Sequence, residues 1–297
     1  MSSPIGFILL THRAPQQILR LVGKLNTMFD QPPIVAHHDF GKCALPLDEI
    51  TPNVQFVRPH LKTAWAQWPV VEGTARAIAQ MYGAPQPPRR FVVLSGADYP
   101  IKPAAKILSD LEAGDYDAHI TYFPVRYGEL NTRMEKLAYK RYCTKTFLYP
   151  SLNKWLRPRT RELNIGHPRL TKYWLPFVKE GLQCYAGWQW FCGSEKAANV
   201  ITEFHRTRPA LSRYYSRSHR PDACPEESYY QTILCNTPGL KIFNDDLRYT
   251  DWSGGGAHPK TLGMEDLPAL LASTKHFARK FDETNTQVLD ELDAVTK

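Results

Sequence analysis

Short hydrophobic runs alternate with amphipathic stretches over the first 122 residues. The runs that predict strands span residues 5–10, 34–36, 54–57, 91–94 and 118–122. The stretches whose apolar residues recur at helical spacing, and so predict helices, span residues 16–29, 75–81 and 106–111. Strands that alternate with helices favour an α/β fold with a parallel, doubly wound sheet.

Polar residues stand where three of these strands end. His12 follows the first strand, His37-His38-Asp39 end the second, and Ser95-Gly96-Ala97-Asp98 follow the fourth. Ligands of such sheets bind beyond the carboxyl ends of the strands. We therefore expect a nucleotide site there, with His12, Asp39, Gly96 and Asp98 among its residues. The adjacent histidines point to opposite sides of a strand and cannot easily share a metal ion, so we expect surface polar residues.

The pattern weakens between residues 123 and 180, a stretch rich in Arg, Lys, Tyr and Pro. Long loops in compact domains are usually functional or mobile, and we interpret this segment as a long excursion with short helices that faces the acceptor or a membrane. Regular structure returns later, in segments at residues 189–192, 195–205, 241–243 and 267–272. Without repeats or a linker, we expect a single domain over 1–297, with a nucleotide-binding half (1–122) and an acceptor and catalytic half (123–297).

Composition narrows the class of protein. The chain is 43% hydrophobic and 22% charged, which suits an ordinary folded core. No apolar run approaches the ~20 residues that span a bilayer. The N-terminus lacks a basic segment and reads as a first strand instead of a signal peptide, so we expect a cytoplasmic protein. The six cysteines form no CxxC pair and are expected to be free thiols.

A formal charge of +8 leaves three kinds of partner open: nucleic acid, an anionic membrane surface and a phosphorylated small molecule. The basic residues are scattered, apart from a cluster at Arg157, Arg159 and Arg161. No zinc-finger or RNP-like pattern accompanies them. Nucleic acid is therefore the least supported of the three.

The segment 220–234 carries the strongest catalytic candidate. Pro221 and Pro225 indicate a loop, and Glu226 and Glu227 then fall in the first turn of an expected helix. The helix dipole favours negative charge there and should keep Glu227 ionised. A carboxylate at such a junction suits a catalytic base. By spacing alone, a simple charge pair at a helix N-terminus is the favoured interpretation, and the other segments of the chain shift it towards a catalytic base.

Four other patterns each have two interpretations. The DxD sequence at 115–117 is typical of metal-binding sugar-nucleotide enzymes, but it follows an expected helix and we interpret it as a turn. The Gly254–Gly256 run suits a phosphate loop or a flexible turn. The basic residues near the C-terminus suit a solvated face or the neutralisation of a diphosphate; they are Lys260, Lys275, Arg279 and Lys280. Trp188, Trp190 and Trp252 suit the core or a sugar-stacking surface.

Several segments together resemble one family in the family's own order. They are residues 94–102 against LSG-x-DYPIK, 187–191 against G-S-x-W-F, 225–232 against PDE-x-x-x-QT, 247–252 against LRY-x-DW, and 266–273 and 277–282 against DLPALLAS and FARKFD. This family contains the core-2/I-branching β-1,6-N-acetylglucosaminyltransferases and the peptide O-xylosyltransferases. The chain is similar to a bacterial member.

The resemblance implies a GT-A-like fold, a Rossmann-like mixed sheet flanked by helices. It also implies a UDP-sugar donor, inversion at the anomeric carbon and no required metal. By position, Glu227 corresponds to the catalytic base, Lys280 to a cation that contacts the diphosphate, and Trp252 to an acceptor-site aromatic, while His12 and Asp39 fall near the uridine-binding strand ends. We add Trp190 and Glu226 to the expected acceptor site.

Two positions depart from the family pattern. The residue before the base is usually Asp and here is Glu226. The second diphosphate cation of the branching enzymes falls at about Ala257, so that Lys260 or Arg279 would have to replace it. The segments at 247–252 and 266–282 look more like the xylosyltransferase side.

We therefore expect an inverting, metal-independent glycosyltransferase without a cofactor. It would move GlcNAc or xylose from a UDP-sugar to a hydroxyl of a glycan or lipid-linked glycan in bacterial surface polysaccharide synthesis. It would act in the cytoplasm, with peripheral contact to the anionic inner face of the membrane and no nucleic-acid partner. An inactive UDP-sugar-binding protein is the alternative.

Overall fold

The computed structural model describes residues 2–150, 160–171, 175–217, 222–256 and 258–296. The strands are β1 (Ile5–Thr11), β2 (Ile34–His38), β3 (Val54–Phe56), β4 (Arg90–Ser95), β5 (Asp98–Pro100), β6 (Ala118–Pro124), β7 (Lys145–Pro150), β8 (Thr160–Ile165), β9 (Tyr185–Ser194), β10 (Ile242–Phe243), β11 (Arg248–Thr250) and β12 (Phe277–Arg279). The helices are α1 (Pro15–Phe29), α2 (Trp68–Tyr82), α3 (Ala104–Ala113), α4 (Arg133–Tyr142), α5 (Pro168–Thr171), α6 (Pro176–Lys179), α7 (Glu195–Thr207), α8 (Pro209–Ser216), α9 (Tyr229–Cys235), α10 (Leu267–Ala272) and α11 (Gln287–Val295), with 3₁₀ turns η1 (Pro225–Glu227) and η2 (Met264–Asp266).

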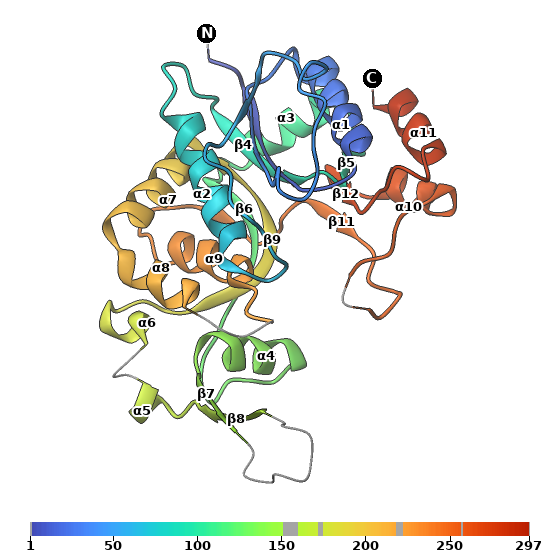
Figure 1. Cartoon of the computed structure of the whole chain (residues 1–297). Coiled ribbons are helices and arrows are strands. Elements are labelled where there is room, and N and C mark those ends of the chain that lie inside the picture. The colour runs from blue at the N-terminus through green and yellow to red at the C-terminus, as the bar shows by residue number, and fades with distance from the viewer. Residues whose placement is uncertain (1, 151–159, 172–174, 218–221, 257, 297) are drawn as a thin grey trace.

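A seven-stranded sheet in the order β10-β6-β9-β4-β1-β2-β3 forms the centre of the fold (Figure 1). Strands β1 to β4 pair in parallel, as do β10 and β6, whereas β9 is antiparallel to both β4 and β6. The all-parallel sheet predicted from the alternating pattern is therefore wrong at β9. That strand is reached through the long excursion after β6, and an antiparallel return needs no crossover helix. The mixed α/β sheet of a GT-A-like fold is confirmed.

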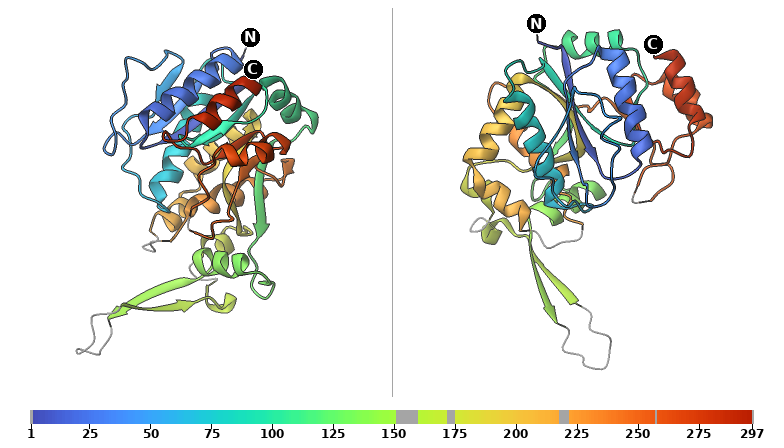
Figure 2. Two further views of the ribbon diagram at one scale, coloured as in Figure 1. Left: turned by 90° about the vertical axis from the view of Figure 1, so that its right-hand side faces the viewer. Right: turned by 45° about the horizontal axis from the view of Figure 1, so that its top comes forward.

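Helices cover both faces of this sheet (Figure 2). On one face, Ile8 and Val93 pack in a core with α2, α7 and α9. On the other, Phe7 and Leu9 pack with α1, α3 and α11. The central strands are buried on both sides, which explains why they read as continuous apolar runs.

A second, three-stranded sheet ties the C-terminal segment to the end of β4. Strand β12 pairs in parallel with β11 and antiparallel with β5, with Arg279 opposite Asp98. This pairing brings Asp98 and Arg279, which are 181 positions apart in the sequence, side by side. The basic C-terminal segment thus lies at the carboxyl end of the main sheet, where a ligand was expected.

The excursion after β6 contains α4, the hairpin of β7 and β8, and the short helices α5 and α6. The hairpin projects from the body of the molecule (Figure 2). Arg157 and Arg159 lie outside the described residues, and Arg161 belongs to β8. The boundary expected at residue 122 falls inside β6, so the two proposed halves share one sheet.

Except for α2, the helices and strands predicted by residue range match the observed ones within a few residues. No range was predicted for α4, α8, β5, β7, β8, β11 or β12. Helix α2 begins at Trp68, seven residues before the predicted start, with Pro69 in its first turn, where a missing N–H costs nothing. The pattern gave no sign of α11. Over the described residues, no helix is both long and apolar enough to cross a membrane.

Candidate active site

The ends of β1 and β2 lie together, as the sequence predicted. The Asp39 carboxylate accepts hydrogen bonds from the Thr63 backbone N–H (2.7 Å), the Thr63 hydroxyl (2.9 Å) and the Gly41 N–H (3.1 Å). Burial opposes ionisation of Asp39, but these bonds outweigh it and lower its pKa. Burial, followed by the charges of Lys42 and Arg13, lowers the pKa of His12. His12 is therefore neutral at pH 7, beside two cations and one carboxylate.

His37 and His38 point to opposite faces of β2, but both are buried and not on the surface as predicted. The His37 ring accepts a hydrogen bond from the Leu61 N–H (3.0 Å). The His38 ring contacts the Thr11 hydroxyl (2.8 Å) and the Cys43 carbonyl (2.7 Å). These partners engage both ring nitrogens of His38 and Nε2 of His37, which lowers the cost of burying the two rings.

Asp98 lies at the centre of a buried ion cluster. Its carboxylate is 3.3 Å from the Arg248 guanidinium and 3.7 Å from that of Arg279, and it accepts bonds from the N–H and hydroxyl of Ser95. Asp98 is 0% exposed. Asp98 is therefore connected to the expected donor site through Arg279. A direct contact between Asp98 and the donor stays a prediction.

The Trp190 ring covers one face of the Arg279 guanidinium, and the arginine side chain remains partly exposed. Its guanidinium lies 4.5 Å from the centre of the Trp190 ring, and its side chain is 19% exposed. Arg13 is among the charges that act on it, which places the end of β1 nearby. Stacking on an aromatic face orients a planar cation. Trp190 is buried, so its position beneath Arg279 differs from an open acceptor surface.

The remaining residues expected in the sugar-donor site differ in whether their side chains already form ion pairs. The Lys260 ammonium is bound by Asp266 (2.7 Å) and Glu265 (3.2 Å). Lys280 is half-buried and, among the described residues, its ammonium has no ion-pair partner. The backbones of these two lysines are adjacent, with the Lys280 N–H 3.5 Å from the Lys260 carbonyl. Gly96 lies against α1, where an added Cβ would stand 3.1 Å from Ile18.

Glu227 belongs to the 3₁₀ turn η1, and the backbone breaks at Ser228 before α9 begins. The expected helix start at Pro225 is thus wrong, and with it the argument that a helix dipole keeps Glu227 ionised. Burial raises the pKa of Glu227, and the Arg141 guanidinium, 3.0 Å away, opposes that rise. Arg141 comes from α4 and also lies 3.8 Å from Asp222.

The Glu227 side chain is 27% exposed and lines a small hollow with Arg141 and Gly187 of β9. An added Cβ at Gly187 would overlap the Thr121 carbonyl at 1.8 Å, because a register shift draws β9 against β6 there. The strand therefore requires glycine beside the carboxylate. A carboxylate with a raised pKa, one charged partner and an open side can accept a proton.

Glu226 differs from its neighbour. It is 6% exposed, and one of its carboxylate oxygens has no hydrogen-bond partner among the described residues. Burial raises its pKa to about 8. Glu226 is thus a neutral carboxylic acid at pH 7, held in the interior, and a role in acceptor binding stays a prediction.

The loop after β3 connects the carboxyl ends of β1 and β2 to η1, the turn that contains Glu227. Thr63 binds Asp39, and three residues later the Ala66 carbonyl accepts from the Cys224 N–H (3.1 Å). Between them, Trp65 meets the His258 ring edge-on at 6.2 Å. The loop after β3 thereby fixes Cys224, and with it η1, relative to the expected nucleotide end of the sheet.

Trp188 and Trp252 form an exposed aromatic pair, with ring centres 6.3 Å apart and planes 27° from parallel. Trp188 comes from β9 and Trp252 from the loop after β11. They are 36% and 47% exposed, respectively. Of the two interpretations of these tryptophans, the core fits Trp190 and a surface platform fits the pair.

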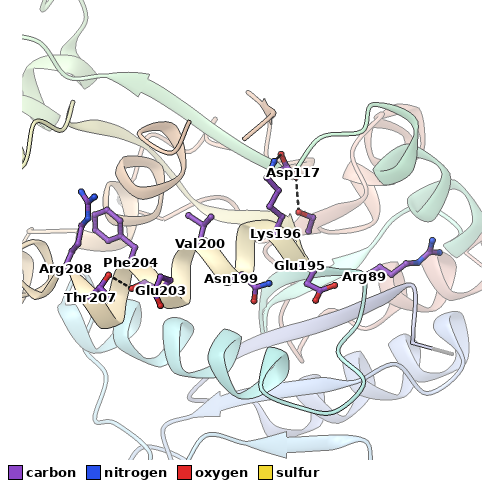
Figure 3. Close-up of a pocket in the computed structure, with 11 residues that line it drawn as sticks. Arg89, Asp117, Glu195, Lys196, Asn199, Val200, Glu203, Phe204, Thr207 and Arg208 are labelled. Carbon is purple, nitrogen blue, oxygen red and sulfur yellow. Dashed lines mark hydrogen bonds and ion pairs between the residues drawn. The ribbon is translucent and has the colours of Figure 1, made fainter. Parts of the chain in front are cut away.

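A groove of about 810 Å³ lies elsewhere. It runs along α7, and Figure 3 shows Asn199, Glu203 and Arg208 along it, with Arg89 at one end. None of the predicted site residues lines it. Volume alone therefore does not identify the site in this chain.

The DxD sequence forms a turn, as predicted. Asp115 is paired with Lys241 (2.7 Å), and Asp117 accepts from Lys196 (3.1 Å) and from the backbone of Lys241. Over the part of the chain that the structure describes, no three His, Cys, Asp or Glu side chains gather as metal ligands would. The six cysteines are free thiols.

Sequence reasoning missed Arg141, Arg248, Arg13 and Thr63. Arg13 had a signal, since it directly follows His12 at the end of β1. Arg141 and Thr63 had none, because their roles depend on contacts with residues 86 and 24 positions away.

The comparison with protein families identifies the class of protein. A model of the core-2/I-branching enzyme family matches residues 44–272, so the chain belongs to the core-2/I-branching enzyme family. Membership makes it a glycosyltransferase, with a nucleotide-sugar donor and a glycan acceptor. No curated protein matches the chain significantly.

Three solved structures illustrate its structural likenesses. A putative glucose-1-phosphate thymidylyltransferase from Bacillus anthracis is 11% identical, with 98% of this chain and 95% of that chain covered and a TM-score of 0.36. A 4-diphosphocytidyl-2C-methyl-D-erythritolsynthase from Anaerococcus prevotii is 10% identical, with 81% and 87% covered and a TM-score of 0.36. The WbbM bifunctional glycosyltransferase is 9% identical, with 100% and 50% covered and a TM-score of 0.40. Scores this low transfer no property to the chain.

Proposed function

We propose that this chain transfers a sugar from a UDP-sugar to a glycan hydroxyl by direct, inverting displacement, without a metal. Glu227 takes the hydroxyl proton as the oxygen attacks the anomeric carbon, and UDP leaves from the opposite face of the sugar. A single displacement needs one base, in contrast to the two-step route that retains configuration. GlcNAc and xylose are the donor sugars that the resemblance favours.

The observation that carries this proposal is the Glu227–Arg141 pair. At 3.0 Å the arginine favours the carboxylate, while burial of Glu227 raises its pKa. Burial outweighs the arginine, so the pKa stays raised and the carboxylate is more basic than an exposed one. A general base works best when its pKa approaches the working pH.

Fixed cations support departure of the diphosphate. Arg279 is oriented by Asp98 and Trp190, and Lys280 is adjacent to it in sequence, with an ammonium that has no ion-pair partner in the described chain. Arg13 and Lys42 add charge at the ends of β1 and β2. Positive groups held in place stabilise a leaving diphosphate as it gains charge. Asp39 and His12 lie where the uridine would be bound.

We further propose that the acceptor is a glycan or lipid-linked glycan of the bacterial surface, met at the inner face of the membrane. A formal charge of +8 supports contact with an anionic surface. Sedimentation with anionic and with zwitterionic vesicles checks this part separately, with retention by the anionic vesicles alone as the expected result.

A donor screen followed by a transfer assay tests the proposed reaction. UDP-GlcNAc, UDP-xylose, UDP-glucuronate, UDP-glucose and UDP-galactose are compared by thermal shift, since a ligand of the folded state raises the melting temperature. The best donor is then incubated with candidate glycans in excess EDTA, and the anomeric configuration of the product is determined by NMR. Transfer that stops in EDTA and returns with Mn²⁺ would contradict the metal-free mechanism. Binding without transfer would indicate an inactive UDP-sugar-binding protein.

A further inference from the structure

Trp188 is an exposed residue that the family resemblance does not supply, whereas the resemblance already implies an acceptor-site role for its neighbour Trp252. The matching family segment has Ser where this chain has Trp188. Two large rings of this kind, each at least a third exposed, leave apolar area in water that packing has not removed. Exposed apolar patches of this kind often mark the ligand-binding surfaces of folded proteins.

The backbone that carries each ring is fixed by hydrogen bonds within the protein. The Trp188 carbonyl accepts a 2.6 Å hydrogen bond from the fully buried Gln231, which belongs to the helix directly after η1. The Trp252 carbonyl accepts from the Gly255 N–H (3.1 Å) in a turn, and the preceding Asp251 carbonyl accepts from the Lys260 N–H (2.8 Å). A platform with fixed backbones loses little conformational freedom when it binds.

The pair stands between the candidate base and the candidate donor cations. Gly187, the residue before Trp188, lines the hollow that contains Glu227. Trp190, two residues further along β9, lies beneath the Arg279 guanidinium. The acceptor must occupy this interval, because its hydroxyl meets the base on one side and the anomeric carbon on the other.

We propose that Trp188, together with Trp252, binds the pyranose ring of the acceptor and makes this enzyme selective for a carbohydrate acceptor. The C–H face of a sugar packs on an aromatic ring, which binds the sugar without competing for its hydroxyls. The reactive hydroxyl stays free to face Glu227. This inference rests on the proposed function and assigns its acceptor subsite.

Binding is tested first on the donor-free protein, by tryptophan fluorescence during titration with methyl β-galactopyranoside, whose axial hydroxyl leaves one continuous C–H face. Glycerol serves as the ring-free control. The wild type and Trp188→Phe should respond to the galactoside and not to glycerol, and Trp188→Ser should not respond. An equal response of the wild type and Trp188→Ser, or none from the wild type, would overturn the inference. This measurement does not depend on transfer.

Kinetics with a glycan acceptor then separate a binding role from a structural one. Trp188→Ser should raise the acceptor KM about tenfold, the effect expected for one aromatic contact, while kcat and the donor KM stay within about twofold. Trp188→Phe should restore most of the affinity. Phe243→Ser, which removes an aromatic of 39% exposure from β10, is the matched control and should change nothing. An unchanged acceptor KM, or an equal rise in the donor KM, would contradict the assignment.

A serine-containing peptide distinguishes the acceptor classes. If Trp188→Ser slows transfer to the peptide as much as to the glycan, the platform does not select carbohydrate and the inference is wrong. If the wild type binds the galactoside but transfers nothing from any donor, the platform stands and the proposed function fails.

Discussion

The proposed donor side and the proposed acceptor side of the candidate active site are built in opposite ways. On the donor side, Asp98, Arg248 and Arg279 form an ion cluster that is largely removed from solvent and fixed by β-pairing between β5 and β12. On the acceptor side, Glu227 has one charged partner and Trp188 and Trp252 face water. A diphosphate has one shape and charge, so a rigid site suits it. An acceptor must enter and leave with the sugar attached, which an open surface allows.

The largest effect is expected on the donor side. Asp98→Asn leaves two guanidinium groups without their carboxylate in the interior, and should destabilise the fold by about 3–5 kcal/mol. Urea unfolding of the two proteins measures this. Asp290→Asn is the matched control, because it breaks an ion pair with Arg20 whose carboxylate is exposed and should cost less than about 1 kcal/mol. Equal losses would show that the buried cluster is not special.

On the acceptor side, the largest effect belongs to Glu227. Glu227→Gln keeps the shape and removes the basicity, so kcat should fall about a hundredfold or more. UDP affinity, measured by calorimetry, should hardly change, because the carboxylate does not face the diphosphate. The same substitution at Glu226 should have a much milder effect on kcat. If the Glu226 variant is the inactive one, the base has been assigned to the wrong residue.

Lys280 tests whether charge on the donor side is needed for binding. Lys280→Ala should weaken UDP binding about tenfold by removing one charge-assisted contact, and leave the melting temperature of the free protein unchanged. Lys260→Ala should do less, since Asp266 and Glu265 already neutralise that ammonium. If the two variants behave in the reverse way, Lys260 is the diphosphate contact.

Arg141 is expected to set the pH dependence of the proposed base, Glu227. Its guanidinium favours the ionised form of Glu227, so Arg141→Gln should raise the pKa of that carboxyl further. The base is then protonated up to a higher pH, and the acid limb of kcat/KM should move upward by about one pH unit. A pH–rate profile measures the shift. Arg133→Gln, an exposed position in the first turn of the same helix, should leave the limb in place.

The smallest effect is expected at Glu226, where substitution should change the stability of the folded protein in a pH-dependent way. Its folded-state pKa of about 8 lies above the ordinary value of 4.5, so the folded protein binds this proton more tightly than the unfolded chain does. Its contribution to stability is full below 4.5 and is lost as pH rises towards 8. Glu226→Gln should therefore gain a few degrees in Tm relative to wild type as pH rises through that window. Glu291→Gln, at an exposed position, should show no such trend.

The sequence by itself determined the α/β class, most strands and helices of the first 122 residues, and the ends of β1, β2 and β4 as the polar end of the sheet. These follow from local periodicity and from the rule that ligands bind at strand ends. The motifs also singled out Glu227 and Arg279. The role of each of these two residues stays a prediction, because a sequence motif does not show which substrate atom a side chain contacts.

Only the tertiary structure decided the direction of β9, the burial of His37 and His38, and the raised pKa values of Glu226 and Glu227. It also decided that Arg141 faces Glu227 and that Trp188 meets Trp252. Each of these depends on residues brought together from distant parts of the chain. Periodicity reports which side of an element is apolar, but it carries no information about which distant side chain completes a charge pair or covers a ring.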